Sequence, residues 1–225
     1  MPEVAALFVE ADGIYSRIPG VDVWDISRDA RLYPGPFPVV AHPPYQRWGR
    51  YWSGGPMLAR TPMAKLLGDD QGCFAAALAA VRQWGGVLEH PEASHAWRHF
   101  GLIGPPRFGG WVTAGDFVGW TCCVEQGHYG HASRKATWLY CVNAQALPLF
   151  TWSNSGKAHR LARMDDGFHS AEERRRAVKR GTPSRLSKLQ RIATPPDFAD
   201  ALVALARQCE RKVDARIRPA QQIGR

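Results

Sequence analysis

The stretch VVAHPPYQ, residues 39–46, joins a short apolar run to a rigid Pro-Pro pair. A continuous apolar run of this length, bounded by turn residues, is typical of a buried strand. Proline fixes the backbone angle φ, so Pro43-Pro44 holds the side chain that follows at a fixed point beyond the strand end. We interpret the stretch as a buried strand that leads into a ligand site. A proline-stiffened loop without a ligand explains this stretch alone equally well.

Similar patterns on both sides of this stretch predict a sheet with interspersed helices. Strands are expected over residues 4–9, 21–26, 37–41, 87–88, 122–125 and 137–142. Helices are expected over 73–84, where Asp69-Asp70 precede and Gly85-Gly86 follow, over 93–100, and over the amphipathic segment 197–213. This order of strand, turn, helix and strand predicts the α/β class, with a doubly wound Rossmann-like sheet.

Polar side chains follow three of the predicted strands, at Asp12, at residues 42–45 and at Glu89. Ligands of open α/β sheets bind at the carboxyl ends of the strands, so we expect these residues to form one site. Glu89 is placed to exchange a proton with a ring nitrogen, and burial is expected to raise its pKa and keep it partly protonated. The alternative is that Glu89 only caps the helix that follows.

A third polar segment, GHASRKATWLY (residues 130–140), crowds hydrogen-bond donors into a turn ahead of an apolar strand. Donors such as Arg134 and Lys135 suit an anionic or carbonyl-rich ligand. A basic hairpin tip in water is the alternative. In the loop after the Pro-Pro pair, Arg47 and Arg50 interleave with Trp48, Tyr51 and Trp52. That mixture suits stacking on bases and pairing with phosphates, or equally a loop that folds back and buries its tryptophans.

The net charge of +9 lies entirely in the last third of the 225-residue chain. Residues 1–156 carry 12 basic and 12 acidic side chains, whereas residues 157–225 carry 17 and 8. This asymmetry predicts a polyanionic partner, nucleic acid first, although a solvated basic tail is the alternative. We divide the chain into an α/β domain (1–150), a basic extension (151–192) and a C-terminal helical part (193–225) that packs back on the α/β domain.

Several classes of protein are not expected from this composition. No apolar run approaches about 18 residues, which argues against a transmembrane helix, and no secretory leader is expected from residues 1–10. The five cysteines include the adjacent pair 122–123, a poor disulfide framework that predicts reduced thiols in a cytoplasm. His128 and His131 near that pair lack the spacing of a zinc site, so no metal is expected.

Taken together and in order, the three polar segments resemble the C5-cytosine DNA methyltransferases, specifically the short methyltransferase-like proteins of phage genomes. The Pro-Pro-Cys-Gln of that family matches residues 43–46, and its Glu-Asn-Val or Glu-Asn-Pro matches residues 89–91. Its Gln-x-Arg-x-Arg matches residues 133–137, and a segment ahead of its last helix matches 186–198. The resemblance covers roughly residues 4–142 and 185–207.

The resemblance implies a Rossmann-like methyltransferase sheet with a basic, partly helical C-terminal extension. It also implies DNA as the partner, S-adenosylmethionine as the cofactor, base modification as the activity, and the cytoplasm of a bacterial host as the location. The residues it assigns to catalysis are Tyr45, Glu89 and His42. Those assigned to the base or to DNA are Gln46, Arg47, Arg50, Arg134, Lys135 and Thr137, and those assigned to the cofactor are Glu10, Asp12, Gly13, Asp25 and Pro43.

Two departures from the family open alternatives. Tyr45 stands at the position of the nucleophilic cysteine, and a phenol with a pKa of about 10 is a poorer nucleophile than a thiol of about 8.5. The chain is therefore either an active relative, an inactive DNA-binding relative that kept the base pocket, or an amino-group (N4/N6) methyltransferase that uses residues 42–45. The family's Phe-x-Gly-x-Gly loop is reduced to residues 8–13 with one glycine. Asp22 or Asp25 is the acid available for the cofactor ribose.

Overall fold

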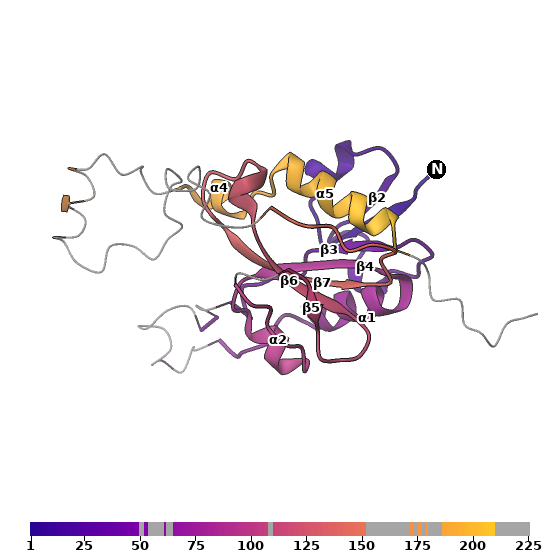
Figure 1. Cartoon of the computed structure of the whole chain (residues 1–225), viewed down its shortest axis with the longest axis horizontal. Helices are drawn as coiled ribbons and strands as arrows, with labels where there is room; N and C mark the ends of the chain where they lie inside the picture. The colour runs from indigo at the N-terminus through magenta and orange to yellow at the C-terminus, as the bar shows by residue number, and fades with distance from the viewer. Residues whose placement is uncertain are drawn as a thin grey trace, which may run out of the picture.

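A mixed β-sheet runs through the middle of the computed structural model, which describes residues 1–49, 52–53, 61, 65–107, 110–151, 172, 175–176, 179 and 186–209 (Figure 1). Its strands are β1 (Val4–Leu7), β2 (Val21–Trp24), β3 (Val39–Ala41), β4 (Gly86–Pro91), β5 (Val112–Thr113), β6 (Trp120–Glu125) and β7 (Ala136–Val142). The helices are α1 (Cys73–Trp84), α2 (His95–His99), α4 (Lys188–Ile192) and α5 (Pro196–Arg207), with the 3-10 helices η1 (Ile14–Arg17), η2 (Ala30–Leu32) and η4 (Gln126–Tyr129).

The order of the strands across the sheet is β2-β1-β3-β4-β7-β6-β5. Strands β2, β1, β3 and β4 are parallel, whereas β7 is antiparallel to both of its neighbours, β4 and β6. Strand β6 therefore runs in the same direction as β4. From β1 the chain passes first to β2 on one side and then to β3 on the other, so the topological switch point lies between β1 and β3.

Helix α1 covers one face of the sheet because its apolar side chains recur at helical spacing. Phe74, Leu78 and Val81 are buried there against β3 and β4. The carboxylate of Asp70 accepts hydrogen bonds from the amides of Gly72 (3.0 Å) and Phe74 (2.8 Å), which satisfies donors at the start of the helix. The predicted bounds of this helix, 73–84, are confirmed.

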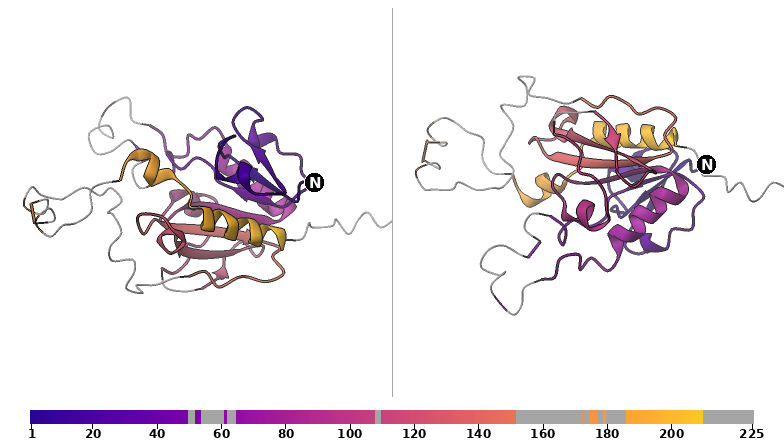
Figure 2. Two further views of the ribbon diagram at one scale, coloured as in Figure 1. Left: turned by 90° about the horizontal axis from the view of Figure 1, so that it is seen from above. Right: turned by 60° about the horizontal axis from the view of Figure 1, so that its bottom comes forward.

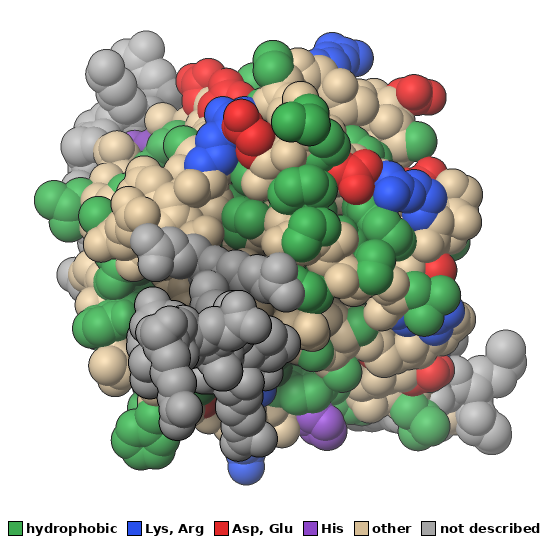
Figure 3. Space-filling model, turned by 90° about the vertical axis from the view of Figure 1, so that its right-hand side faces the viewer, with side chains coloured by type: hydrophobic (Ala, Val, Ile, Leu, Met, Phe, Trp, Pro, Cys, Tyr) green, Lys and Arg blue, Asp and Glu red, His purple; other side chains and the backbone are tan. Residues whose placement is uncertain are grey.

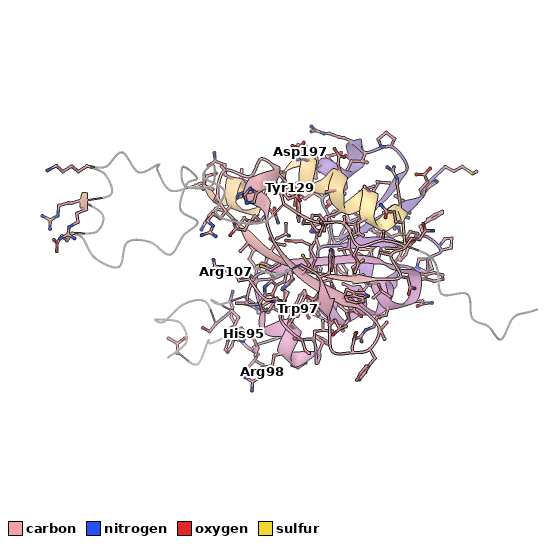
Figure 4. The ribbon with its side chains drawn as sticks, viewed as in Figure 1. His95, Trp97, Arg98, Arg107, Tyr129 and Asp197 are labelled. Atoms are coloured by element: carbon pink, nitrogen blue, oxygen red, sulfur yellow. The ribbon has the colours of Figure 1, made fainter. Side chains whose placement is uncertain are left out.

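The short helix α2 packs on the same side of the sheet as α1. Ser94 caps it by accepting a hydrogen bond from the amide of Ala96. Trp97 points toward the sheet and is buried, whereas His95 and Arg98 are exposed on the outer side of the helix (Figure 4). Glu89 is therefore not the cap of this helix, and its role has to be sought on its own strand.

Helix α5 covers the opposite face of the sheet, so the fold is wound on both faces (Figure 2). Phe198, Leu202 and Leu205 are buried among the side chains that β1, β3 and β4 direct to that face, such as Val40 and Val87. Pro196 stands at the first helical position, where its missing N–H leaves no donor unsatisfied. The expected helix 197–213 is present from residue 196 to 207, and positions beyond 209 lie outside the described residues.

The predicted α/β class is confirmed by this arrangement, and each predicted strand overlaps a strand of the sheet. Most of the segment 157–185, which carries much of the basic charge, lies outside the described residues. The side of the molecule away from α4 mixes acidic, basic and apolar side chains and shows no region of one sign (Figure 3). Among the described residues, no helix combines the length and apolar character that crossing a membrane requires.

Candidate functional site

The ends of β1, β3 and β4 bring three polar side chains together beneath α5. His42 follows β3 directly, Glu89 lies near the end of β4, and Tyr15 follows β1 in η1. Residues 41 and 88 are opposite each other in the register of β3 and β4, which places His42 level with Glu89. Alternation along each strand puts both side chains on the face that α5 covers. Of the three strand ends expected to lie together, those of β3 and β4 bring His42 and Glu89 into contact, whereas Asp12 after β1 is exposed.

A chain of hydrogen bonds joins the three side chains. The Nδ1 atom of His42 lies 2.9 Å from Oε2 of Glu89, and its Nε2 atom lies 2.6 Å from the hydroxyl of Tyr15. Gln126, at the start of η4, donates from Nε2 to Oε1 of Glu89 over 3.1 Å. The side chains of His42 and Glu89 are only 13% and 12% exposed. Both ring nitrogens of His42 are therefore engaged within the protein, while a small part of each side chain still reaches solvent.

The expected raised pKa of Glu89 is wrong. Burial alone would raise the pKa of this carboxyl, but the hydrogen bond and charge of His42 outweigh it and hold the pKa at about 2. The charges of Lys135 and His90 act in the same direction. Glu89 is thus ionised at neutral pH and accepts hydrogen bonds without donating any.

Tyr45 follows His42 by three residues, after the Pro-Pro pair. Pro43 is buried and Pro44 is exposed, and the Tyr45 side chain after them is 39% exposed. Burial raises the pKa of its phenol, the positive charge of Arg191 opposes that shift, and the negative charge of Glu89 adds to it. Tyr45 therefore presents a neutral hydroxyl and an accessible ring, which suits stacking better than nucleophilic attack.

Three residues assigned to base or DNA binding make contacts within the protein. Arg134 forms an ion pair with the buried Glu125. The Nζ atom of Lys135 donates to the carbonyls of Ile192 (3.1 Å) and Ala193 (2.7 Å) at the end of α4. Thr137 is buried, accepts a hydrogen bond from Gln126 and donates one to the carbonyl of Lys135. These contacts build the wall of the site on the side of β7.

The loop after Tyr45 folds back at its first tryptophan. Trp48 is 2% exposed, packs against Phe74 and Phe100, and donates from Nε1 to the carboxylate of Asp70 over 2.8 Å. The loop was expected either to stack on bases or to fold back and bury its tryptophans, and for Trp48 the second interpretation is correct. Gln46 is exposed and Arg47 is partly buried, whereas Arg50 and Tyr51 lie outside the described residues.

The residues expected to hold the cofactor follow three adjacent strands, β1, β2 and β3. The turn after β1 is closed by a hydrogen bond from the amide of Gly13 to the carbonyl of Glu10, and a Cβ at Gly13 would meet that oxygen at 3.0 Å. Glu10 and Asp12 lie in this turn and are exposed. Asp22 lies within β2 and is paired with Arg28.

At the switch point, buried Tyr15 reaches from the segment after β1 to His42 after β3. A ligand binding between these two strands would compete with Tyr15 for that space. Asp25 follows β2 directly, as an acid that holds a ribose would, and its Oδ1 accepts hydrogen bonds from Ser27 and Arg28. Of the residues expected to hold the cofactor, only Asp25 fits a methyl donor, as the acid that would bind its ribose.

Tyr15 and Gln126 belong to the site and were missed by the sequence patterns. Gln126 directly follows β6, which runs in the same direction as β4, so its position at a strand end was a usable signal. Tyr15 follows β1 only after a turn, and no pattern in the sequence distinguishes it. Comparisons of the chain with protein-family models, with curated proteins and with solved structures find no match.

Proposed function

We propose that the chain binds an extruded base of DNA at the carboxyl ends of β3 and β4, as a methyltransferase-like protein of the DNA-modification class. The observation that carries the proposal is the hydrogen-bonded pair of His42 and Glu89, with the exposed Tyr45 three residues after His42 and close enough to Glu89 for that charge to raise the pKa of its phenol. An accessible aromatic ring beside an ionised carboxylate supplies a stacking surface and polar contacts for the edge of a base.

The sheet supports this proposal by analogy. An antiparallel strand, β7, lies between β4 and β6, which both run in the opposite direction to it. This arrangement is compatible with the Rossmann-like methyltransferase sheet that the sequence resemblance implies. Because one fold hosts many functions, the proposal rests on the site residues and not on the fold alone.

The side chains favour recognition of the base over covalent chemistry on it. C5 transfer needs a thiolate, and burial raises the pKa of Cys122 and of Cys123 to about 12. Transfer to an amino group needs a free acceptor at position 42, and both ring nitrogens of His42 are engaged by Tyr15 and Glu89. We therefore propose that the chain is a DNA-binding relative of these enzymes that kept the base pocket.

Binding of single-stranded oligonucleotides by Tyr45 variants tests this proposal. Tyr45→Ala removes the stacking surface and is expected to weaken binding by roughly 1–3 kcal/mol, whereas Tyr45→Phe keeps the ring and should bind almost as the wild type does. Phe117→Ala is the matched control, because Phe117 is fully exposed in the loop before β6, at the opposite end of that strand from Gln126. Wild-type affinity in Tyr45→Ala would refute the proposal.

Methyl transfer with S-adenosylmethionine is the second candidate function, and the place of Asp25 at the end of β2 favours it. Calorimetric titration with S-adenosylmethionine and with its demethylated product separates the two candidates. We expect no heat of binding from either ligand. Saturable binding that Asp25→Asn weakens would establish the second candidate in place of the first.

A further inference from the structure

We propose that the base held beside Tyr45 is guanine, because Glu89 offers two hydrogen-bond acceptors and no donor. This inference rests on the proposed function and names the base that the site selects. It departs from the resemblance, which implies cytosine. Three properties of the site carry it: the direction of its hydrogen bonds, the lone pairs that Glu89 has left, and the donors that each base presents.

The hydrogen bonds around Glu89 are directed toward its carboxylate. An ionised carboxylate only accepts, so the Nδ1 atom of His42 carries the hydrogen that lies between it and Oε2. The amide nitrogen of Gln126 likewise donates to Oε1. The same amide also donates to Thr137, at 2.9 Å, so its orientation is fixed by two acceptors. These donors hold Glu89 in its ionised form.

Glu89 keeps acceptor capacity on both of its oxygens. Each carboxylate oxygen has about two lone-pair positions. Oε1 accepts from Gln126 and Oε2 accepts from His42, which leaves about one position on each oxygen for a ligand. The side chain of Glu89 keeps 12% of its surface exposed to solvent, and the inference requires that this part includes the carboxylate oxygens. The site is thus suited to a ligand with two adjacent donors.

Guanine is the base that matches this pattern. Its Watson–Crick edge presents N1–H and N2–H₂ side by side, which pair with the two oxygens of a carboxylate. Cytosine and adenine each place an acceptor nitrogen beside their amino group, so a lone pair would face the ionised Glu89. Thymine has one N–H between two carbonyls. A cytosine bound here needs a proton either on its N3 atom or on Glu89. The hydrogen-bond donors around Glu89 oppose protonation of that carboxylate.

Oligonucleotides of thymidine with one central guanine, hypoxanthine, cytosine or adenine test the inference by fluorescence anisotropy at one fixed salt concentration. Hypoxanthine is the matched control, since it lacks only the N2 amino group of guanine. Guanine is expected to bind at least about tenfold more tightly than cytosine or adenine, with hypoxanthine in between. Equal affinity for guanine and hypoxanthine, or tighter binding of cytosine, would overturn the assignment.

The variant Glu89→Gln adds a second test. Glutamine keeps the size of the side chain but presents one donor and one acceptor, so the preference for guanine over cytosine should disappear. Circular dichroism checks that the variant is folded, and the comparison of guanine with hypoxanthine in the wild type does not depend on it. If Tyr45→Ala does not weaken binding, the proposed function fails. If it does while guanine has no advantage, only the choice of base fails.

Discussion

Glu89 and His90 are neighbours on β4, yet their side chains lie on opposite faces of the sheet. Glu89 accepts hydrogen bonds from His42 and Gln126. His90 is fully buried, with its ring packed against Phe74 and Trp97. Burial lowers the pKa of His90 to about 4, so its imidazole is neutral in the folded protein at neutral pH.

Acid is therefore expected to destabilise the protein through His90. The unfolded chain takes up this proton near the ordinary value of 6.5, whereas the folded chain resists it until about pH 4. The free energy of unfolding should fall as the pH drops between these values, by on the order of 3 kcal/mol in full. Above pH 4.5 the contribution of Glu89 is unchanged, because that carboxyl releases it only between 4.5 and about 2. His131, whose pKa burial also lowers, acts in the same direction as His90, so a His90 variant is needed to separate the two.

Urea unfolding of the wild type and of His90→Gln, measured at pH 7 and at pH 5, checks this expectation. Glutamine does not titrate, so the variant should lose less stability than the wild type between the two pH values. Parallel losses in both proteins would show that other groups cause the acid sensitivity.

The meeting of His42 with Glu89 could be predicted from the sequence, because both follow apolar strands of one sheet. The charge of Glu89 could not, because the pKa of a buried carboxyl depends on which donors reach it. Those donors come from residues 47 and 37 positions away, His42 and Gln126. Tyr15 escaped prediction for the same reason, since only the fold places its hydroxyl on His42.

Among the elements, the entry into β4 depends on a single glycine. Gly86 has φ +122°, and a Cβ there would lie 2.0 Å from the carbonyl oxygen of Val39 on β3. That oxygen belongs to the backbone of the neighbouring strand, so it has little freedom to move. The close pairing of β3 with β4 sets the level of His42 against Glu89.

Gly86→Ala is accordingly expected to prevent the folding of the sheet. Gly72→Ala is the control, because Gly72 also has positive φ (+78°) but a Cβ there would meet nothing within 4 Å. The control should lose only about 1 kcal/mol, which is the conformational penalty without the clash. Thermal unfolding and soluble yield compare the two variants. A folded Gly86→Ala protein with a melting temperature equal to that of Gly72→Ala would contradict the steric argument.

The elements themselves followed closely from local patterns where those patterns are strong. The apolar face and the flanking Asp70 and Gly85 defined α1 at both ends. Strand β4 was expected as two residues and spans six, because Glu89 and His90 are polar residues whose burial depends on tertiary partners. The pairing of β7 between β4 and β6 is set by long-range contacts that periodicity does not encode.

Charge is the property that distinguishes the two parts of the chain as a whole. The excess of +9 lies in residues 157–225, and α4 within that range is held beside the site by Lys135. Replacing Arg174, Arg175 and Arg176 by Gln should leave the fold intact and lower the salt dependence of binding. On single-stranded DNA, the slope of log affinity against log salt should decrease by about 0.7 for each phosphate that these arginines neutralise in the wild type.

Anisotropy titrations over a series of salt concentrations provide the measurement. Replacing Glu172 and Glu173 by Gln is the control, because it removes negative charges from the same segment. This variant should leave the slope unchanged or make it steeper. An unchanged slope in the triple Arg variant would show that these arginines neutralise no phosphate of the bound DNA.

The position of α5 has a consequence for synthesis on the ribosome. The face that β1, β3 and β4 present to α5 is complete once residue 91 has been made, but the helix that covers it begins at residue 196. At a synthesis rate of about 5–20 residues per second, this apolar face stays uncovered for roughly 5–20 s before α5 is made. During that interval the nascent chain is a substrate for holding chaperones, and slowing translation between these two points should increase its capture by them.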